Sequence, residues 1–247
     1  MITKYNYSNV LIIIPARLKS SRLPSKLLLD LHGYPLIYWT ISQIKNSKLA
    51  QFIVATDSLE ISQVCDQYGF PSIMTSDNCT NGTERVHEVA KKYQYKFEYF
   101  INVQADEPLI NVKIIEKLLE TIGFNDFSFK TAVSKITNSN YNNPSEVKVA
   151  MSADNRIRYA SRNLVPFHRD YSGTFYKIHG VYLYPMKILD LFIDFNEGII
   201  EKKEKVEQLR CIENDIPLYG VITPSSFKSV DTKDDFEMYK KIPEYFQ

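Results

Sequence analysis

The sequence lacks the glycine-rich signatures of the common nucleotide-binding loops. Only eight of its 247 residues are glycine, and no GxG pair occurs among them. The dinucleotide fingerprint GxGxxG is therefore missing, and so is the GK[ST] element of a P-loop. GxSxG and HExxH are also missing, so the serine-hydrolase and zinc-hydrolase classes have little support.

Cysteine and long apolar runs are scarce as well. The three cysteines, Cys65, Cys79 and Cys211, form no CxxC pair, which argues against a disulfide framework or a zinc site. No stretch approaches the ~18 consecutive apolar residues of a membrane span. The N-terminus has too short an apolar core for a signal peptide. These features predict a protein of the reduced cytoplasm, with no membrane partner.

The chain has no strong excess of charge of either sign. It carries 30 basic and 29 acidic residues, for a formal net charge of +1. No global field therefore favours nucleic acid or an anionic membrane. Any attraction for anions must be local.

The pattern of apolar residues predicts strands that alternate with helices. Residues 10–16 form a continuous apolar run of strand length, typical of a central strand buried on both faces. Further strands are expected at 51–57, 71–76 and 98–108. Helices are expected at 34–47, 59–69, 83–93 and 111–122. Such a series predicts an α/β fold with a largely parallel sheet, whose ligands bind beyond the carboxyl ends of the strands.

The middle of the chain has a different pattern. From about 127 to 185 the segments are strand-like, after which helix and strand patterns return. Near the end, Thr232 is expected to cap a helix, with Asp235 in the capping-box position. We therefore expect one domain over 1–247 with a β-rich insertion at about 127–185.

A basic loop follows the first predicted strand. Its four cations, Arg17, Lys19, Arg22 and Lys26, have no acidic residue among them. A solvated surface turn would also explain such a loop. However, four cations around a turn at the end of a buried strand can hold a triphosphate, arginine by forked hydrogen bonds and lysine as a point charge.

Two acidic segments could supply metal ligands. "NVQADEP" at 102–108 places Asp106 and Glu107 at the end of a strong predicted strand, and "VDT" at 230–232 contains Asp231. Mg²⁺ prefers such oxygen ligands and usually takes one or two carboxylates together with phosphates. Alternatively, the first pair caps the next helix and Asp231 marks a helix N-terminus.

These segments together resemble one known family. "IIIPARLKSSRLPSK" (12–26), "VATD" (54–57), "NGTER" (81–85), "NVQADEP", "VEQLR" (206–210) and "VDT" occur in the order found in the 3-deoxy-manno-octulosonate (Kdo) cytidylyltransferases. The resemblance runs from about residue 9 to 242. It implies a nucleotidyltransferase (Rossmann-like) fold, a homodimer built partly through the insertion, and dependence on Mg²⁺. The implied reaction converts CTP and Kdo to CMP-Kdo and pyrophosphate, for lipopolysaccharide or capsule assembly.

The resemblance also implies roles for particular residues. Arg17, Arg22 and Lys26 would hold the phosphates of CTP, and Asp106 and Asp231 would bind Mg²⁺. Arg85 would help to frame the nucleotide. The residues expected to hydrogen-bond the sugar acid are Gln104, Glu207 and Gln208.

Two positions depart from the family pattern. Ala105 stands where the family usually has glycine, and alanine in a backbone conformation natural only to glycine would cost roughly 1 kcal/mol. Ile178 stands where the family commonly has a sugar-contacting histidine, with His179 beside it. One residue of shift in a strand turns a side chain to the opposite face.

The departures leave alternatives open. One is a cytidylyltransferase for another sugar acid, such as 8-amino-Kdo or a sialic-acid-like sugar. Another is a nucleotide-binding relative without catalysis, although the presence of both Asp106 and Asp231 argues against it.

Overall fold

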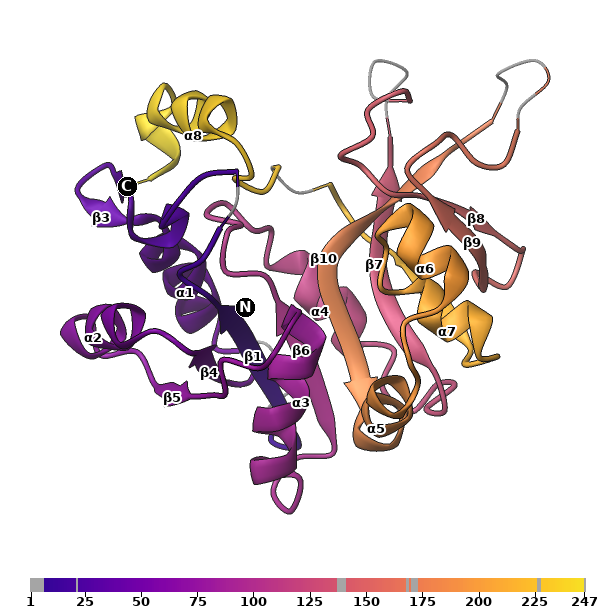
Figure 1. Ribbon diagram of the computed structural model, residues 1–247, viewed down its shortest axis with the longest axis horizontal. Helices are drawn as coiled ribbons and strands as arrows, with labels where there is room; N and C mark the ends of the chain where they lie inside the picture. Colours follow the sequence, from indigo (N-terminus) through magenta and orange to yellow (C-terminus); the bar gives the residue numbers. More distant parts are fainter. Residues whose placement is uncertain are drawn as a thin grey trace. The chain divides into compact units, whose positions relative to one another are not determined.

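The computed structural model describes residues 7–20, 22–136, 141–167, 169, 173–225 and 228–246 (Figure 1). The chain divides into two compact units. Unit 1 comprises Met1–Val112 and Ser226–Gln247, and unit 2 comprises Lys113–Ser225. Among the helices in the described ranges, none is long and apolar enough to cross a membrane.

Unit 1 contains a parallel sheet. Its strand order is β6 (Tyr99–Val103), β1 (Val10–Ala16), β4 (Gln51–Thr56) and β5 (Ser72–Met74). All seven residues of β1 are buried, which confirms the predicted central strand. Because the strands are parallel, the segments that follow β1, β4 and β6 begin at the same edge of this sheet.

The helices of unit 1 are α1 (Leu36–Ser47), α2 (Leu59–Gln67), α3 (Gly82–Tyr93) and α8 (Lys233–Lys240). Short pieces complete the unit: the 3₁₀ turns η1 (Lys26–Leu28) and η3 (Pro243–Tyr245), and the hairpin of β2 (Asp30–Leu31) with β3 (Tyr34–Pro35). Helix α3 packs against β1, β4 and β6. The four strands predicted for this part exist, and so do the helices predicted at 34–47, 59–69 and 83–93, but some bounds were wrong. Tyr34 and Pro35 pair with the preceding strand, and β6 ends at Val103 in a turn.

Side-chain caps fix the starts of α2, α3 and α8, with Ser58 as the cap of α2. The Asn81 side chain accepts a hydrogen bond from the Glu84 amide (2.9 Å) at the start of α3. Thr232 caps α8, and the Asp235 carboxylate accepts from the Thr232 amide (2.8 Å), so the predicted capping box is confirmed. The caps satisfy backbone N–H groups that the first helical turn leaves without partners.

The described part of unit 2 combines a mixed sheet with four short helices. Its strands are β7 (Phe129–Lys135), β8 (Lys148–Met151), β9 (Ile157–Ser161), β10 (Tyr176–Pro185) and β11 (Leu218–Ile222). Its helices are α4 (Lys113–Leu119), α5 (Met186–Asp194), α6 (Ile199–Glu204) and α7 (Leu209–Glu213). Strand β7 pairs with β10 and β11, and β8 pairs with β9 and β10.

The predicted β-rich segment 127–185 lies within unit 2. Its described part contains β7 to β10, while residues 137–140, 168 and 170–172 lie outside the described ranges. Unit 2 begins before this segment and ends after it. The expectation of a single domain over 1–247 stays a prediction.

A buried ion pair joins two helices of unit 2, α6 and α7. Arg210 of α7 donates Nη2 to Glu201 Oε1 (2.7 Å) and Nε to Glu201 Oε2 (2.9 Å) on α6. Its guanidinium lies 4.6 Å from the centre of the Phe192 ring on α5. The two charged side chains are only 8% and 6% exposed, so each depends on the other for charge compensation.

We expect Arg210→Met to lower the free energy of unfolding by about 3 kcal/mol, because it leaves the Glu201 carboxylate buried without its cation. Urea unfolding followed by circular dichroism measures the change. Lys92→Met is the matched control, since it removes an exposed ion pair with Glu88 on α3. The control substitution is expected to lower the free energy of unfolding by less than about 0.5 kcal/mol. Equal losses in the two variants would contradict a structural role for the buried pair.

Candidate functional site

A polar cavity of about 200 Å³ lies at the carboxyl edge of the unit 1 sheet. Six of the predicted site residues line it: Arg17, Arg22, Lys26, Gln104, Asp106 and Asp231. Lys19, Ser20 and Ala105 lie in the same wall. The parallel strand order brings these segments together from distant parts of the sequence.

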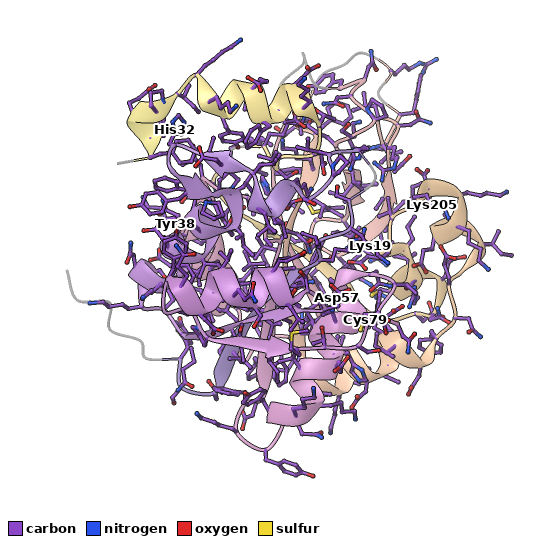
Figure 2. The ribbon with its side chains drawn as sticks, turned by 60° about the vertical axis from the view of Figure 1, so that its left-hand side comes forward. Lys19, His32, Tyr38, Asp57, Cys79 and Lys205 are labelled. Atoms are coloured by element: carbon purple, nitrogen blue, oxygen red, sulfur yellow. The ribbon has the colours of Figure 1, made fainter. Side chains whose placement is uncertain are left out.

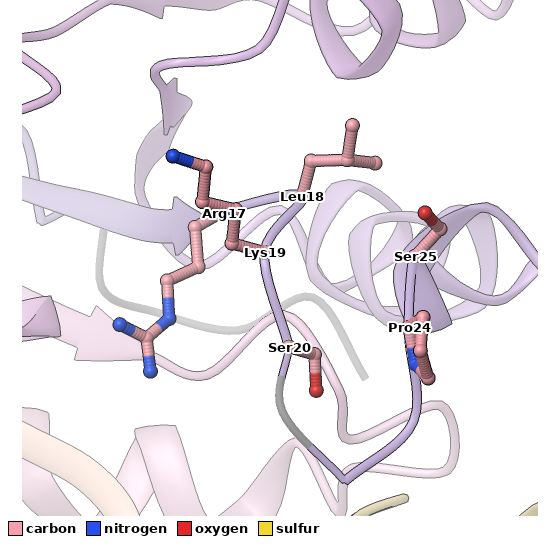
Figure 3. A pocket seen from close by; sticks show the side chains of 6 residues that line it. All are labelled: Arg17, Leu18, Lys19, Ser20, Pro24 and Ser25. Carbon is pink, nitrogen blue, oxygen red and sulfur yellow. The ribbon is translucent and has the colours of Figure 1, made fainter.

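The basic loop surrounds a second, larger hollow. This hollow measures about 570 Å³ and is lined by residues 17–20 together with Pro24 and Ser25. Arg17 and Lys19 extend to the same side of the loop, whereas Leu18 extends to the other side (Figure 3). Arg17 Nη1 donates to the carbonyl of Thr80 at 3.4 Å. Arg17 therefore lies next to the segment that precedes α3, and Lys19 extends to the same side of the loop.

The two predicted metal-binding acids lie on segments joined through the backbone. The Val230 amide donates to the carbonyl of Asp106 at 2.9 Å. The Asp235 carboxylate accepts from the Asp231 amide (3.1 Å) at the start of α8. The end of β6 and the start of α8 thus hold Asp106 and Asp231 beside each other.

One lysine ammonium group contacts both acids. Lys26 Nζ forms an ion pair with Asp106 Oδ2, lies 3.3 Å from Asp231 Oδ1, and donates to the carbonyl of Val230 at 2.8 Å. Arg22 Nη2 lies 3.0 Å from the same Asp231 oxygen. The Lys26, Asp106 and Asp231 side chains are 14%, 18% and 25% exposed. The two ion pairs of Lys26 are therefore shielded from water on most sides, whereas the Arg22 side chain is 58% exposed.

The acid pair fits a divalent cation that also binds phosphate. In the described ranges, no group of three or more histidine, cysteine or acidic side chains could hold a metal ion. Asp106 and Asp231 nevertheless contact one common cationic atom, so a single ion can reach both. Mg²⁺ needs only one or two protein carboxylates when phosphate oxygens and water complete its shell.

Comparisons with known proteins identify the family. Residues 11–220 match the family model described as cytidylyltransferase. The 3-deoxy-manno-octulosonate cytidylyltransferase of Koribacter versatilis (strain Ellin345) is 36% identical over 233 residues, covering 93% of this chain and 88% of the relative. The chain belongs to the 3-deoxy-manno-octulosonate cytidylyltransferase family. The resemblance noted in the sequence is thereby confirmed.

Two further family members extend the match. The enzyme of the same name from Francisella tularensis subsp. holarctica (strain LVS) is 35% identical over 249 residues, covering 95% of this chain and 98% of the relative. A solved CMP:2-keto-3-deoxy-manno-octonic acid synthetase complexed with CTP has a TM-score of 0.90 at 30% identity, covering 97% of this chain and all of that chain. The expected nucleotidyltransferase fold is therefore confirmed.

Arg85 is not among the residues that line the cavity. Its side chain, on α3, is 3% exposed, and Nη2 donates to Asp57 Oδ2 at 2.7 Å. Nη1 donates to Thr75 Oγ1. Asp57 follows β4 (Figure 2) and Thr75 follows β5, so Arg85 connects two strand ends. The guanidinium of Arg85 therefore has its partners within unit 1. Its expected contact with the nucleotide stays a prediction.

Gln104 and Ala105 follow β6 at the cavity. Gln104 Nε2 donates to Asn102 Oδ1 at 3.1 Å. A Cβ atom on Gly82 would lie 3.5 Å from Gln104 Nε2, so the start of α3 packs closely here. Ala105 is not among the residues with positive φ, and its carbonyl accepts from Thr40 Oγ1 at 3.0 Å. The strain of roughly 1 kcal/mol that a glycine-only conformation would impose on Ala105 is therefore not present.

Glu207 and Gln208 belong to unit 2 and immediately precede α7. Gln208 is 4% exposed, and its Nε2 donates to Glu207 Oε1 at 3.2 Å. The ion pair of Arg210 with Glu201 anchors α7 just beyond them. Their role toward the sugar acid stays a prediction.

His179, which lies beside the position where the family commonly has a histidine, is buried in unit 2. It is 7% exposed, and its Nε2 lies 2.7 Å from Ser134 Oγ on β7. Burial, with a smaller contribution from Lys177, lowers the pKa of His179 to about 4. His179 is therefore neutral near pH 7 and pairs with a neighbouring strand.

Two contacts of the site were not predicted from the sequence. Four cations in one loop and acids at two neighbouring segments predict ion pairs, but the sharing of Lys26 by both acids was not expected. The pairing of Asp57, the last residue of the strand expected at 51–57, with Arg85 was not expected either. A buried arginine needs a carboxylate nearby, and this requirement could have identified that pair.

We expect His179→Gln to make folding stability less dependent on pH between 6.5 and 4. The unfolded histidine takes up a proton near pH 6.5, whereas the folded one does so only near 4. The wild type therefore has its full stability above pH 6.5 and loses roughly 3 kcal/mol through this residue as the pH falls to 4. Urea unfolding of both proteins at several pH values measures the difference. Parallel curves for the two would contradict the neutral, buried state of His179.

Proposed function

We propose that this chain transfers CMP from CTP to the anomeric hydroxyl of Kdo and releases pyrophosphate. The observation that carries the proposal is the unit 1 cavity, where the cations of the basic loop adjoin the acid pair Asp106 and Asp231. Membership of the family supports the same activity, as does the likeness to a synthetase complexed with CTP.

The basic loop suits the triphosphate. At neutral pH a nucleoside triphosphate carries roughly four negative charges, because its terminal phosphate has a second pKa near 6. Arg17, Lys19, Arg22 and Lys26 supply four positive charges. The arginines can grip phosphate oxygens with two parallel hydrogen bonds, and the lysines act as point charges. These groups would also offset the charge that grows on the departing pyrophosphate.

The reaction is an in-line displacement at phosphorus. The anomeric oxygen of the sugar forms a bond to the α-phosphorus as the bond to the pyrophosphate oxygen breaks, and the hydroxyl proton passes to solvent. Positioning and charge neutralisation supply most of the catalysis in such transfers. Mg²⁺, bound by Asp106 and Asp231, would polarise the phosphoryl oxygens and neutralise developing charge.

The remaining roles follow from the family. Gln104, Glu207 and Gln208 keep their predicted role as hydrogen-bond partners of the sugar acid, and Arg85 supports the strand ends beside the nucleotide. A homodimer in the cytoplasm that supplies lipopolysaccharide or capsule assembly completes the proposal.

A pyrophosphate-release assay tests the proposal. CTP and Mg²⁺ are incubated with Kdo, with 8-amino-Kdo, with a sialic acid, or without sugar. We expect the highest kcat/KM with Kdo. A higher value with another sugar acid would reassign the substrate, and release with none of them would favour the non-catalytic relative.

We expect Asp106→Asn to lower kcat by at least about 100-fold, because it removes a charge that holds the metal and its contribution to the transition state. The same assay at saturating CTP and Kdo measures the loss. Asp66→Asn, an exposed acid on α2, is the control and should leave kcat unchanged. Near-normal turnover of Asp106→Asn at saturating Mg²⁺ would remove Asp106 from the catalytic role.

A further inference from the structure

The Lys26 ammonium group occupies the position where the two metal-binding carboxylates converge. We infer that Lys26 acts as an internal substitute for the divalent cation in the nucleotide-free protein. The acid pair then accepts a metal ion only after the triphosphate has drawn Lys26 away. This inference rests on the proposed function, because it assigns Asp106 and Asp231 to the metal.

The contacts of Lys26 account for all its donors. An ammonium group has three N–H donors, and Nζ has three oxygen partners: Asp106 Oδ2, Asp231 Oδ1 and the Val230 carbonyl. The Lys26 side chain is 14% exposed, so water replaces few of these contacts. Ser25 directly before it has φ 51° and ψ 28°, a left-handed conformation, and Lys26 then begins η1.

The charges balance in the nucleotide-free state. Asp106 and Asp231 carry two negative charges, and Lys26 and Arg22 pair with them. A free divalent ion must displace a tethered ammonium group to reach both carboxylates. This competition weakens metal binding as long as Lys26 stays in place.

The triphosphate reverses this balance. Its roughly four negative charges compete with the acids for Lys26 and Arg22, the two loop cations that pair with Asp231. Once these cations turn to the phosphates, the two carboxylates lack partners, and a divalent ion restores neutrality. Nucleotide and metal therefore bind with positive coupling, and each raises the affinity for the other by the same factor.

Mn²⁺ binding to the nucleotide-free protein tests the exchange directly. Electron paramagnetic resonance measures free Mn²⁺ during titration of the wild type, Lys26→Met and Lys26→Gln. We expect both variants to bind Mn²⁺ at least about tenfold more tightly than the wild type, because the competing charge is gone. Lys26→Gln keeps a hydrogen-bond donor for the Val230 carbonyl and guards against a folding defect in Lys26→Met.

Lys19→Met is the matched control for general electrostatics. It removes one positive charge from the same loop and the same cavity wall, yet no ion pair of Lys19 with an acid occurs among the described residues. We expect its Mn²⁺ affinity to stay within about twofold of the wild type, since an exposed charge is screened. Adding Asp106→Asn to Lys26→Met should abolish the gain and thereby locate the ion at the acid pair.

Two results would overturn the inference. Equal Mn²⁺ affinity in the wild type and both Lys26 variants would show that Lys26 does not compete, and equal gains in the Lys19 and Lys26 variants would indicate only a diffuse field. Neither result depends on turnover. If Kdo proves not to be the substrate, the Mn²⁺ titration still decides the role of Lys26; if the titration fails, pyrophosphate release still decides the activity.

Discussion

The backbone hydrogen bond from Val230 to the carbonyl of Asp106 joins the segment before α8 to the end of β6. It brings two carboxylates into contact with the same ammonium group, that of Lys26. Two acids held this close repel each other unless a cation lies between them. The part of the cavity that surrounds them depends on this requirement, which a lysine meets here and a metal ion can meet as well.

Hydrogen bonds hold the segments around the acid pair in place. The Thr232–Asp235 capping box fixes the start of α8, and Arg85 connects the ends of β4 and β5 through Asp57 and Thr75. In the described part of the basic loop, Arg22 and Lys26 pair with the acids and Arg17 donates to the Thr80 carbonyl. Acids held by the backbone and a helix cap, together with cations that can turn to phosphate, suit a site that takes up a highly charged nucleotide and then releases pyrophosphate.

Unit 2 uses buried charge in a different way. The Arg210–Glu201 pair holds α6 and α7 together, and His179 stays neutral against Ser134. Neither arrangement leaves an uncompensated charge in the interior, which would be costly. The polar groups of Glu207 and Gln208 therefore sit next to a firmly anchored helix.

The sequence by itself determined most of the alternation of strands and helices in unit 1, the buried central strand and six of the residues that line the cavity. Apolar periodicity, acids at the ends of strands and the basic loop are local properties that can be recognised in the sequence alone. The bounds of β6 and α1 were set instead by a turn and by a two-strand hairpin, which depend on pairing. Only the tertiary structure showed that Lys26 forms ion pairs with both Asp106 and Asp231, and that Arg85 forms an ion pair with Asp57. It also showed that the backbone of Ala105 is not in a conformation that favours glycine. The two contacts depend on distances between residues far apart in the chain, which no local pattern carries, and the conformation of Ala105 depends on the turn that follows β6.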